Sequence, residues 1–179
     1  MKPITEYILN IENVLSDEIC DKICNNLGTN YFERATTGDN VEDISERNCH
    51  YKRLNKEYDK YLYEAVGKIL VTYKNKHPHF VTGLSIEDTG YDHLLYKGSE
   101  NGEYKMHTDH YDLAPRVLSI SFILNDNYDG GDFVFFEDKS YTVTKKKGSA
   151  VVFPSNFCFP HAVVPVSNGD RHSIITWIR

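Results

Sequence analysis

The sequence predicts a mainly β fold with supporting helices, in which two sheets form a jelly roll and N-terminal helices pack on one face. About eight or nine short strand-like runs separated by Gly, Asn and Asp turns follow residue 83, and helical spacing dominates before residue 80. A chain of 179 residues with 40% hydrophobic content suits one domain. We therefore expect a single domain over 1–179, with helical support and a loop in 1–80 and the jelly-roll core in 83–179.

The N-terminal part begins with an alternating stretch over 4–11 that predicts a strand. Ser16 is then placed to cap a helix that carries acids in its first turn and stops at Gly28. A second helix is expected over 52–76, because apolar residues recur there at helical spacing until His77-Pro78.

The segment 29–51 between these helices is polar and shows no period. A loop of this length in a compact domain is either a functional lid or a tolerated surface excursion, and both remain open. Arg34, Arg47 and His50 are its candidate functional residues.

The expected strands of the core are short and regularly spaced. They lie near 84–87, 91–97, 103–109, 116–124, 132–137, 140–144, 149–153, 161–165 and 172–178.

Charge and composition narrow the class of partner. A formal net charge of -6 argues against general nucleic-acid binding, which depends on Lys and Arg that neutralise phosphates. No run of residues is long and apolar enough for a membrane span, and the first residues lack the apolar core of a signal peptide, so we expect a soluble intracellular protein. The four cysteines form no CxxC pair, and Cys20 and Cys24 suit helix packing better than metal binding.

His107 and Asp109 form the first half of a candidate metal site. On a strand, residues two apart point from the same face. A third ligand from a distant segment would complete the two-histidine, one-carboxylate set of non-haem Fe(II) oxygenases, and His161 is the best candidate. The alternative, a zinc hydrolase motif that includes His110, lacks its upstream histidine.

Arg171 and Ser173 form a second same-face pair, ten residues beyond His161. A guanidinium beside a hydroxyl is a good receptor for a carboxylate. Metal ligands together with an anchored carboxylate suggest a 2-oxo acid that chelates iron. His172 alternates to the opposite face and should point away from this cofactor.

The C-terminal half resembles the 2-oxoglutarate- and Fe(II)-dependent oxygenase superfamily, and most closely its prolyl 4-hydroxylase-like branch. The ordered series spans about ninety residues and is far more specific than a lone HxD. The matching residues are Leu94-Leu95-Tyr96 with Gly98, Tyr104-x-x-His107-x-Asp109, Arg116-x-Leu118-Ser119, Phe122 to Asn125, Gly130 to Phe133, Gly148 to Pro154, Pro160-His161-x-Val163-x-Pro165-Val166, Gly169-Asp170-Arg171-x-Ser173 and Trp177.

The resemblance implies a double-stranded β-helix of the cupin-like type and a dioxygenase that uses Fe(II), 2-oxoglutarate and O2, and it leaves ascorbate open as a further cofactor. It implies metal ligation by His107, Asp109 and His161, and a cosubstrate carboxylate held by Arg171 with Ser173. Tyr96 is the expected second contact to 2-oxoglutarate and Tyr104 the alternative. Arg116 matches a position near the peptide substrate, or pairs with an acid in the turn before it.

The expected reaction is hydroxylation of a prolyl residue in a peptide or protein. Two alternatives remain at this point. One is the same chemistry on a free amino acid, a small metabolite or a nucleobase. The other is a cupin-like metal-binding module without turnover.

Overall fold

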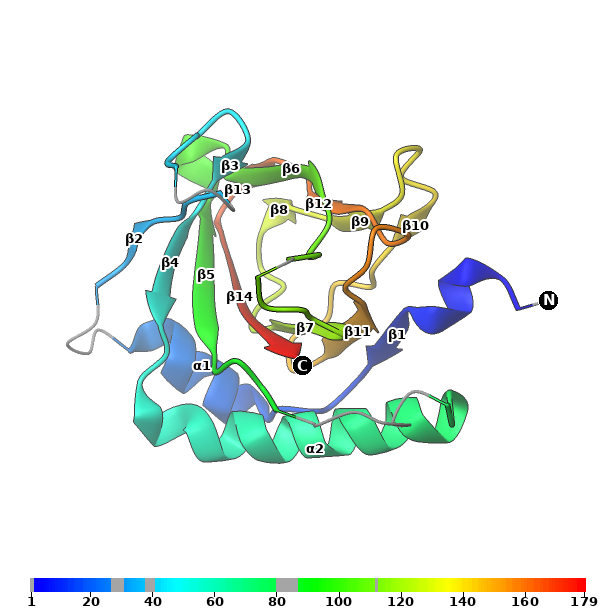
Figure 1. The fold of residues 1–179 in the computed structure, drawn as a ribbon. Coiled ribbons are helices and arrows are strands. Elements are labelled where there is room, and N and C mark those ends of the chain that lie inside the picture. The colour runs from blue at the N-terminus through cyan, green and yellow to red at the C-terminus, as the bar shows by residue number, and fades with distance from the viewer. Residues whose placement is uncertain (1, 27–30, 38–40, 80–86, 112) are drawn as a thin grey trace.

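Two antiparallel sheets face each other in the computed structural model, which describes residues 2–26, 31–37, 41–79, 87–111 and 113–179 (Figure 1). The seven-stranded sheet runs in the order β1 (Leu9–Ile11), β11 (Ala150–Pro154), β7 (Leu118–Ile123), β14 (Asp170–Ile178), β5 (Asp92–Lys97), β4 (His50–Arg53), β2 (Glu33–Arg34). The five-stranded sheet runs β10 (Tyr141–Thr142), β9 (Phe133–Phe135), β12 (His161–Val163), β6 (Glu103–His107), β3 (Arg47–Asn48). A two-stranded ribbon joins β13 (Val166–Asn168) to β8 (Asp129–Gly130). The expected double-stranded β-helix is confirmed.

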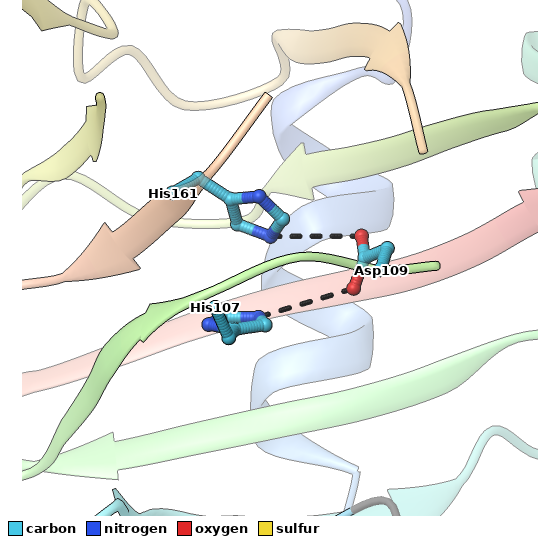
Figure 2. A group of neighbouring side chains, drawn as sticks. All are labelled: His107, Asp109 and His161. Carbon is cyan, nitrogen blue, oxygen red and sulfur yellow. Dashed lines mark ion pairs between the residues drawn. The ribbon is translucent and has the colours of Figure 1, made fainter. Parts of the chain in front are cut away.

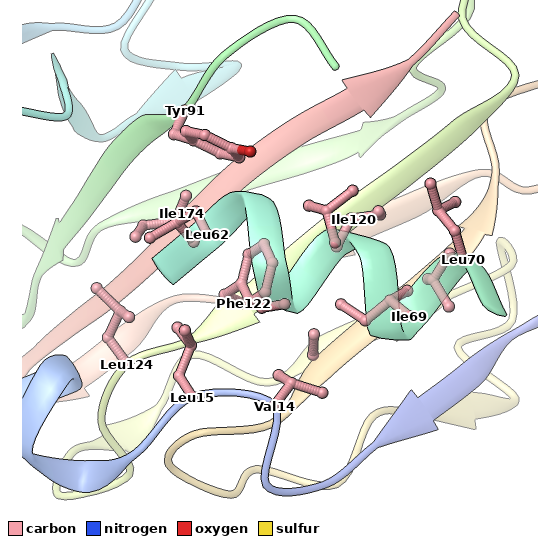
Figure 3. Close-up of a cluster of buried hydrophobic side chains, with 14 of the residues drawn as sticks. Val14, Leu15, Leu62, Ile69, Leu70, Tyr91, Ile120, Phe122, Leu124 and Ile174 are labelled. Atoms are coloured by element: carbon pink, nitrogen blue, oxygen red, sulfur yellow. The ribbon is translucent and has the colours of Figure 1, made fainter. Parts of the chain in front are cut away.

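Two α-helices, α1 (Asp17–Asn25) and α2 (Asp59–Lys76), cover the outer face of the seven-stranded sheet (Figures 1 and 3). Leu62 and Ile69 of α2 are fully buried, and they belong to one cluster with Ile120 and Phe122 of β7. Burying such side chains contributes roughly 1.5–3 kcal/mol each. The helices therefore lie on one face, as the sequence predicted.

A second apolar cluster fills the space between the two sheets. Phe135 and Phe153 are fully buried, with ring centroids 4.7 Å apart in an edge-to-face arrangement. This geometry is the one that aromatic quadrupoles favour. This aromatic cluster packs against the strands that carry the polar residues of the interior.

Two of the helix ends predicted from capping residues agree with the structure. The Ser16 side chain accepts a hydrogen bond from the backbone N–H of Ile19 at 3.3 Å and so caps α1. The helix α1 ends at Asn25, with Asn26 as its C-cap residue, earlier than the predicted stop at Gly28, which itself lies outside the described residues. The helix α2 ends at Lys76, and His77 is its C-cap residue.

The first predicted strand is only partly right. Residues Ile4–Tyr7 form the 3-10 helix η1, because Glu6 and Ile8 donate backbone hydrogen bonds to Pro3 and Thr5. Only Leu9–Ile11 pair as a strand, with β11.

The boundary between the predicted loop 29–51 and the predicted helix 52–76 is wrong. Residues Arg47–Asn48 and His50–Arg53 are strands β3 and β4, which pair with β6 and β5 respectively. A short 3-10 helix η2 (Lys56–Tyr58) then precedes α2. Non-local pairing gives this polar stretch its β structure, so no local pattern could show it.

Most predicted core strands are confirmed with shorter bounds. The run 84–87 lies almost wholly outside the described residues. Strands β8 and β13 escaped prediction because each is only two or three residues long. Between β5 and β6 the chain forms the 3-10 helix η3 (Gly98–Glu100).

Cys20 is fully buried and Cys24 partly buried in the helix-facing core, as expected for packing residues. Burial raises the pKa of Cys20 to about 12 and that of Cys24 to about 11. Across the described parts of the chain, no helix is both long enough and apolar enough to cross a membrane. The intracellular location stays a prediction.

Candidate metal and cosubstrate site

The two candidate histidine ligands come from neighbouring strands. His107 is the last residue of β6 and His161 the first of β12, and the two are direct partners in the antiparallel register. Their rings lie 4.3 Å apart between centroids. The sheet itself therefore brings together two residues that are 54 positions apart in the sequence.

Asp109 completes the group from the segment that follows β6 (Figure 2). Its Oδ1 lies 3.9 Å from His107 Nε2, and its Oδ2 lies 3.6 Å from His161 Nε2. One ligand atom from each of the three residues lies within 4.8 Å of the others. The prediction that His107 and Asp109 share one strand is wrong, because β6 ends at His107; the carboxylate nevertheless converges on both imidazoles.

Both histidines expose the same ring nitrogen to Asp109. His107 Nδ1 lies 2.8 Å from the Lys105 carbonyl and His161 Nδ1 lies 3.0 Å from the Phe159 carbonyl. Because a carbonyl oxygen can only accept a hydrogen bond, each Nδ1 carries a proton. Each Nε2 is then unprotonated, and its lone pair is available to a metal ion. Burial, reinforced by neighbouring His161, lowers the pKa of His107 to about 3. Neutral imidazoles of this kind are metal ligands.

Asp109 is oriented by two hydrogen-bonded serines, here called the serine relay, that the sequence analysis did not single out. Ser119 donates from Oγ to Asp109 Oδ2 at 2.6 Å, and its Oγ lies 2.8 Å from Ser155 Oγ. Burial opposes ionisation of Asp109, but His161, His107 and the Ser119 hydroxyl outweigh it and lower the carboxyl pKa. Ser119 had been noted only as part of a motif; its inward position on β7 is what relates it to the ligand.

Arg171 lies on β14 and is 3% exposed. It donates from Nη1 to Ser173 Oγ at 2.9 Å, while its Nε is buried with no hydrogen-bond partner. No acidic side chain in the described ranges lies within ion-pair distance of its guanidinium. A buried cation without an anion is costly, so this site has the character of a receptor for a carboxylate. His172 points to the other face, where its Nδ1 lies 3.0 Å from His93 Nε2, as predicted.

The two candidate tyrosines occupy different parts of the interior. Tyr96 is 2% exposed and is the register partner of Arg171, whose guanidinium carbon lies 5.0 Å from the tyrosine ring centroid. Tyr104 stacks on His107 instead, with ring centroids 3.5 Å apart. Tyr96 is thus beside the candidate carboxylate receptor and Tyr104 beside the candidate metal ligands.

Tyr128 is a further neighbour of Arg171 that the sequence analysis missed. Burial raises the pKa of Tyr128, while the Arg171 charge and a hydrogen bond from Arg171 act against that rise. Gly131 makes room for both side chains, since a Cβ there would come within 2.9 Å of the Tyr128 ring and 3.2 Å of Arg171 Cδ.

These residues line two neighbouring cavities that share several side chains. A narrow inner cavity of about 50 Å³ is lined by the metal-ligand candidates, both tyrosines, Arg171 and Ser173. An outer cavity of about 400 Å³ shares Arg47, Tyr104, Asp109 and Trp177 with it. Trp177 lines both cavities.

Arg116 and Arg47 form part of the wall of the outer cavity. Arg116 donates to the Asp109 carbonyl at 3.3 Å, and its guanidinium carbon lies 3.7 Å from the Trp177 ring centroid. The candidate acid in the turn before Arg116, Asp112, lies outside the described residues. Arg47, one of the residues highlighted in the predicted loop, donates to the Thr36 carbonyl at 2.7 Å and lies over Tyr104.

A larger cavity, of about 720 Å³, lies elsewhere, between η1, the end of α2 and the start of β7. Its buried polar side chains are already paired: Tyr73 donates to the Tyr7 carbonyl and His77 Nε2 lies 3.2 Å from the Glu6 carbonyl. The inner cavity is the better candidate site despite its size, because lone-pair nitrogens, a carboxylate and an unpaired guanidinium converge only there within the described structure.

A double-stranded β-helix with two imidazoles and one carboxylate converging in its interior is the architecture of a facial-triad metal protein. The model of the 2OG-Fe(II) oxygenase superfamily matches residues 92–179, from the start of β5 to the last residue. Residues 92–179 of the chain are therefore similar to this superfamily, as the sequence predicted.

Two curated proteins are similar to parts of the chain. The chain is 36% identical over 66 residues to prolyl 3-hydroxylase 2 of Mus musculus, and this match covers 35% of the chain and 9% of the relative. It is 29% identical over 91 residues to a PKHD-type hydroxylase of Parvibaculum lavamentivorans, covering 48% and 41%. The chain thus spans less than half the length of either relative.

Among solved structures, a prolyl hydroxylase from Trichoplax adhaerens, in complex with a peptide fragment of the hypoxia inducible factor oxygen degradation domain, superposes with a TM-score of 0.80. The match covers 97% of this chain and 84% of that one at 20% sequence identity. At this identity the likeness is one of fold.

Proposed function

We propose that this protein is an Fe(II)- and 2-oxoglutarate-dependent dioxygenase that hydroxylates a prolyl residue of a peptide or protein. The observation that carries the proposal is the combination, in one interior, of the His107, Asp109 and His161 group with the unpaired buried guanidinium of Arg171. A metal site alone would fit many reactions. The carboxylate receptor next to it is what a chelating 2-oxo dicarboxylate requires.

The donor set fits the metal that the family implies. Two neutral imidazole Nε2 atoms and one ionised carboxylate would hold Fe(II) and leave positions free for a cosubstrate and oxygen. When bound, the iron and 2-oxoglutarate would supply the oxidising power for C–H hydroxylation. The role of Ser119 is to fix the Asp109 carboxylate, and the two backbone carbonyls fix the imidazoles.

The cosubstrate fit rests on Arg171 and its neighbours. We assign the distal carboxylate of 2-oxoglutarate to Arg171, with Ser173 and the Tyr96 side of the cavity beside it. The orphaned Nε of Arg171 would gain an acceptor there. Arg171, Ser173 and Tyr96 are buried, and the lower local dielectric strengthens their interactions with a bound carboxylate.

A prolyl substrate is supported by two lines of argument. Two of the similar proteins named above are prolyl hydroxylases by name, and the third is a PKHD-type hydroxylase. The outer cavity is large enough to admit a side chain of a peptide, and it presents Tyr104 and Trp177 to an extended chain. Such a chain loses little entropy on binding when it is preformed, as in polyproline-like segments.

The test is to incubate the iron-loaded protein with 2-oxoglutarate and proline-containing peptides, and to measure succinate together with peptide mass. We expect succinate formation to rise with peptide, and the peptide to gain one oxygen atom. If a free amino acid, a metabolite or a nucleobase does both while the peptides do neither, the small-molecule alternative is correct. A protein that binds iron but forms no succinate with any substrate would be a non-catalytic metal-binding module.

The metal assignment has its own test. His107→Ala and Asp109→Ala should each abolish retention of iron together with turnover. Full iron occupancy in either variant would contradict the assignment, whatever the substrate.

A further inference from the structure

Two arginines of the outer cavity have no acidic partner among the described residues. Arg47 donates to the Thr36 carbonyl and lies with its guanidinium carbon 4.7 Å from the Tyr104 ring centroid, while its Nε is buried without a partner. Arg116 donates to the Asp109 carbonyl and lies over the rings of Trp177 and Tyr111. Every recorded contact of these guanidinium groups is thus with an uncharged acceptor or a ring face.

Other arginines in the same part of the fold are neutralised. Arg34 pairs with Glu100 at 2.8 Å, and Arg53 pairs with Asp92 at 3.0 Å. Asp92 is the acid that lines the outer cavity apart from Asp109, so its charge is already matched. The chain has a formal net charge of -6. Even so, no carboxylate among the described residues forms an ion pair with Arg47 or Arg116.

The proposed cofactors would not supply the missing negative charge. The two positive charges of Fe(II) and the one of Arg171 are balanced by Asp109 and the two carboxylates of 2-oxoglutarate. Both guanidinium groups of the outer cavity therefore remain uncompensated. Burial lowers the pKa of Arg116, which reflects the cost of keeping its charge there. Partly buried charges that lack a partner are costly, and a bound anion would remove that cost.

We infer that the substrate carries a carboxylate side chain, Glu or Asp, within one or two residues of the hydroxylated proline, and that Arg47 and Arg116 bind it. A guanidinium fork matches a carboxylate in geometry as well as in charge. This inference rests on the proposed function and narrows it from any prolyl peptide to an acidic one.

The experiment compares peptides that differ only in one residue, Glu, Gln or Lys, placed in turn one and two positions before and after the proline. We expect kcat/KM to fall in that order, with the Glu peptide preferred over the Gln peptide by about tenfold or more, as for a charge-assisted hydrogen bond. Arg47→Gln and Arg116→Gln should each bring the Glu to Gln ratio toward unity. The KM for 2-oxoglutarate should change far less, because Arg171 is intact.

Arg34→Gln is the matched control. It removes a positive charge from the same N-terminal layer, but from a guanidinium that Glu100 neutralises and that does not line the cavity. The Glu to Gln ratio should stay at its wild-type value. Arg47→Glu adds a reversal, since it should favour the Lys peptide over the Glu peptide.

Binding gives a readout that does not depend on turnover. With Mn(II) and 2-oxoglutarate under anaerobic conditions, fluorescence anisotropy of labelled peptides should show the same order of affinity, and the advantage of the Glu peptide should shrink as salt rises. Equal affinity for Glu and Gln peptides would overturn the inference, as would a Glu preference that survives in both arginine variants. If no peptide is hydroxylated at all, the proposed function fails, and the binding comparison still decides whether the cavity selects a carboxylate.

Discussion

Each candidate metal-binding histidine is oriented by the backbone carbonyl two residues before it. His107 faces the Lys105 carbonyl and His161 faces the Phe159 carbonyl. The two imidazoles therefore present Nε2 inward without any side-chain partner for Nδ1. Asp109 differs, because side-chain hydroxyl groups hold it, and this makes its orientation open to mutation.

Ser119→Ala should weaken metal binding and leave the fold intact. It removes the 2.6 Å hydrogen bond to Asp109 Oδ2, and the loss of a partner that orients a ligand typically costs about 10- to 100-fold in metal affinity. Titration of the metal-free protein with Fe(II) or Mn(II) measures it. Ser155→Ala, which acts one hydroxyl further away, should have a smaller effect; equal affinity in wild type and Ser119→Ala would mean that the relay has no role in ligation.

Arg171 variants separate cosubstrate binding from metal binding. Arg171→Ala should weaken 2-oxoglutarate binding by about two to three orders of magnitude, by analogy with the roughly 3–5 kcal/mol cost of breaking a buried ion pair. Arg171→Lys should also raise the KM, because one ammonium cannot form a fork. Ser173→Ala should cost only about 1 kcal/mol.

The dependence of succinate formation on 2-oxoglutarate, measured beside iron affinity in the same variants, checks this assignment. Iron affinity should be nearly unchanged in all three. Wild-type cosubstrate affinity in Arg171→Ala would show that Arg171 is structural and that the carboxylate is held elsewhere.

At the scale of elements, the segment from β3 to β4 joins the two sheets at one corner. Arg47 pairs in register with Tyr104 of the five-stranded sheet, and His50 pairs with Leu95 of the seven-stranded sheet. Glu100 of η3 anchors this corner through Arg34 at 2.8 Å, His50 at 2.9 Å and Lys97 at 3.0 Å. The corner includes Arg47, whose side chain lines both cavities.

Glu100→Gln should destabilise the protein by about 1–2 kcal/mol at neutral pH, a value reduced for the partial exposure of these pairs. Hydrogen bonding from His50, against the opposing effect of burial, lowers the pKa of Glu100 to about 2, below the 4.5 of a free glutamate. The stabilisation is therefore present above about pH 4.5 and lost as pH falls toward 2. Urea unfolding at pH 7 and pH 3 measures it.

The difference between wild type and Glu100→Gln should shrink at pH 3. Glu103, which pairs with the exposed Lys105, provides a control. Glu103→Gln should change stability little at either pH. A pH-independent effect of Glu100→Gln would mean that packing of the side chain matters and its charge does not.

For the whole molecule, buried and partly buried histidines away from the candidate metal site make stability sensitive to mild acid. Burial lowers the pKa of His93 well below its usual value, and burial also lowers those of His172 and His77. The unfolded chain binds protons at these residues near pH 6.5 while the folded chain does not. Stability should therefore fall as pH drops below about 6.5, by at most about 1.4 kcal/mol per pH unit for each such histidine.

His93→Leu should make this pH dependence shallower, since it removes the histidine with no exposed surface and an unpaired buried Nδ1. Denaturant unfolding of wild type and variant between pH 8 and pH 5, both without metal, gives the two slopes. His79→Leu, at an exposed position, is the matched control and should leave the slope unchanged. Parallel slopes for His93→Leu and wild type would contradict the prediction.

The sequence alone determined the features that depend on local spacing and residue type. Alternation and turn residues predicted most core strands, and Ser16 predicted the start of α1, because capping and side-chain direction act over a few residues. The order of motifs identified His107, Asp109, His161 and Arg171 as candidates, since each belongs to a chemically specific pattern.

Only the tertiary structure decided which residues surround them. Ser119, Tyr128 and Arg47 act on the site through strands that pair across long sequence separations, and a polar stretch such as 47–53 becomes β structure only when two sheet edges are present to receive it. Asp109 lies past the end of its strand and still reaches both imidazoles, because the register of β6 with β12 sets that distance. Local patterns carry no information on such pairings, whose free energy comes from contacts between segments that are far apart in the chain.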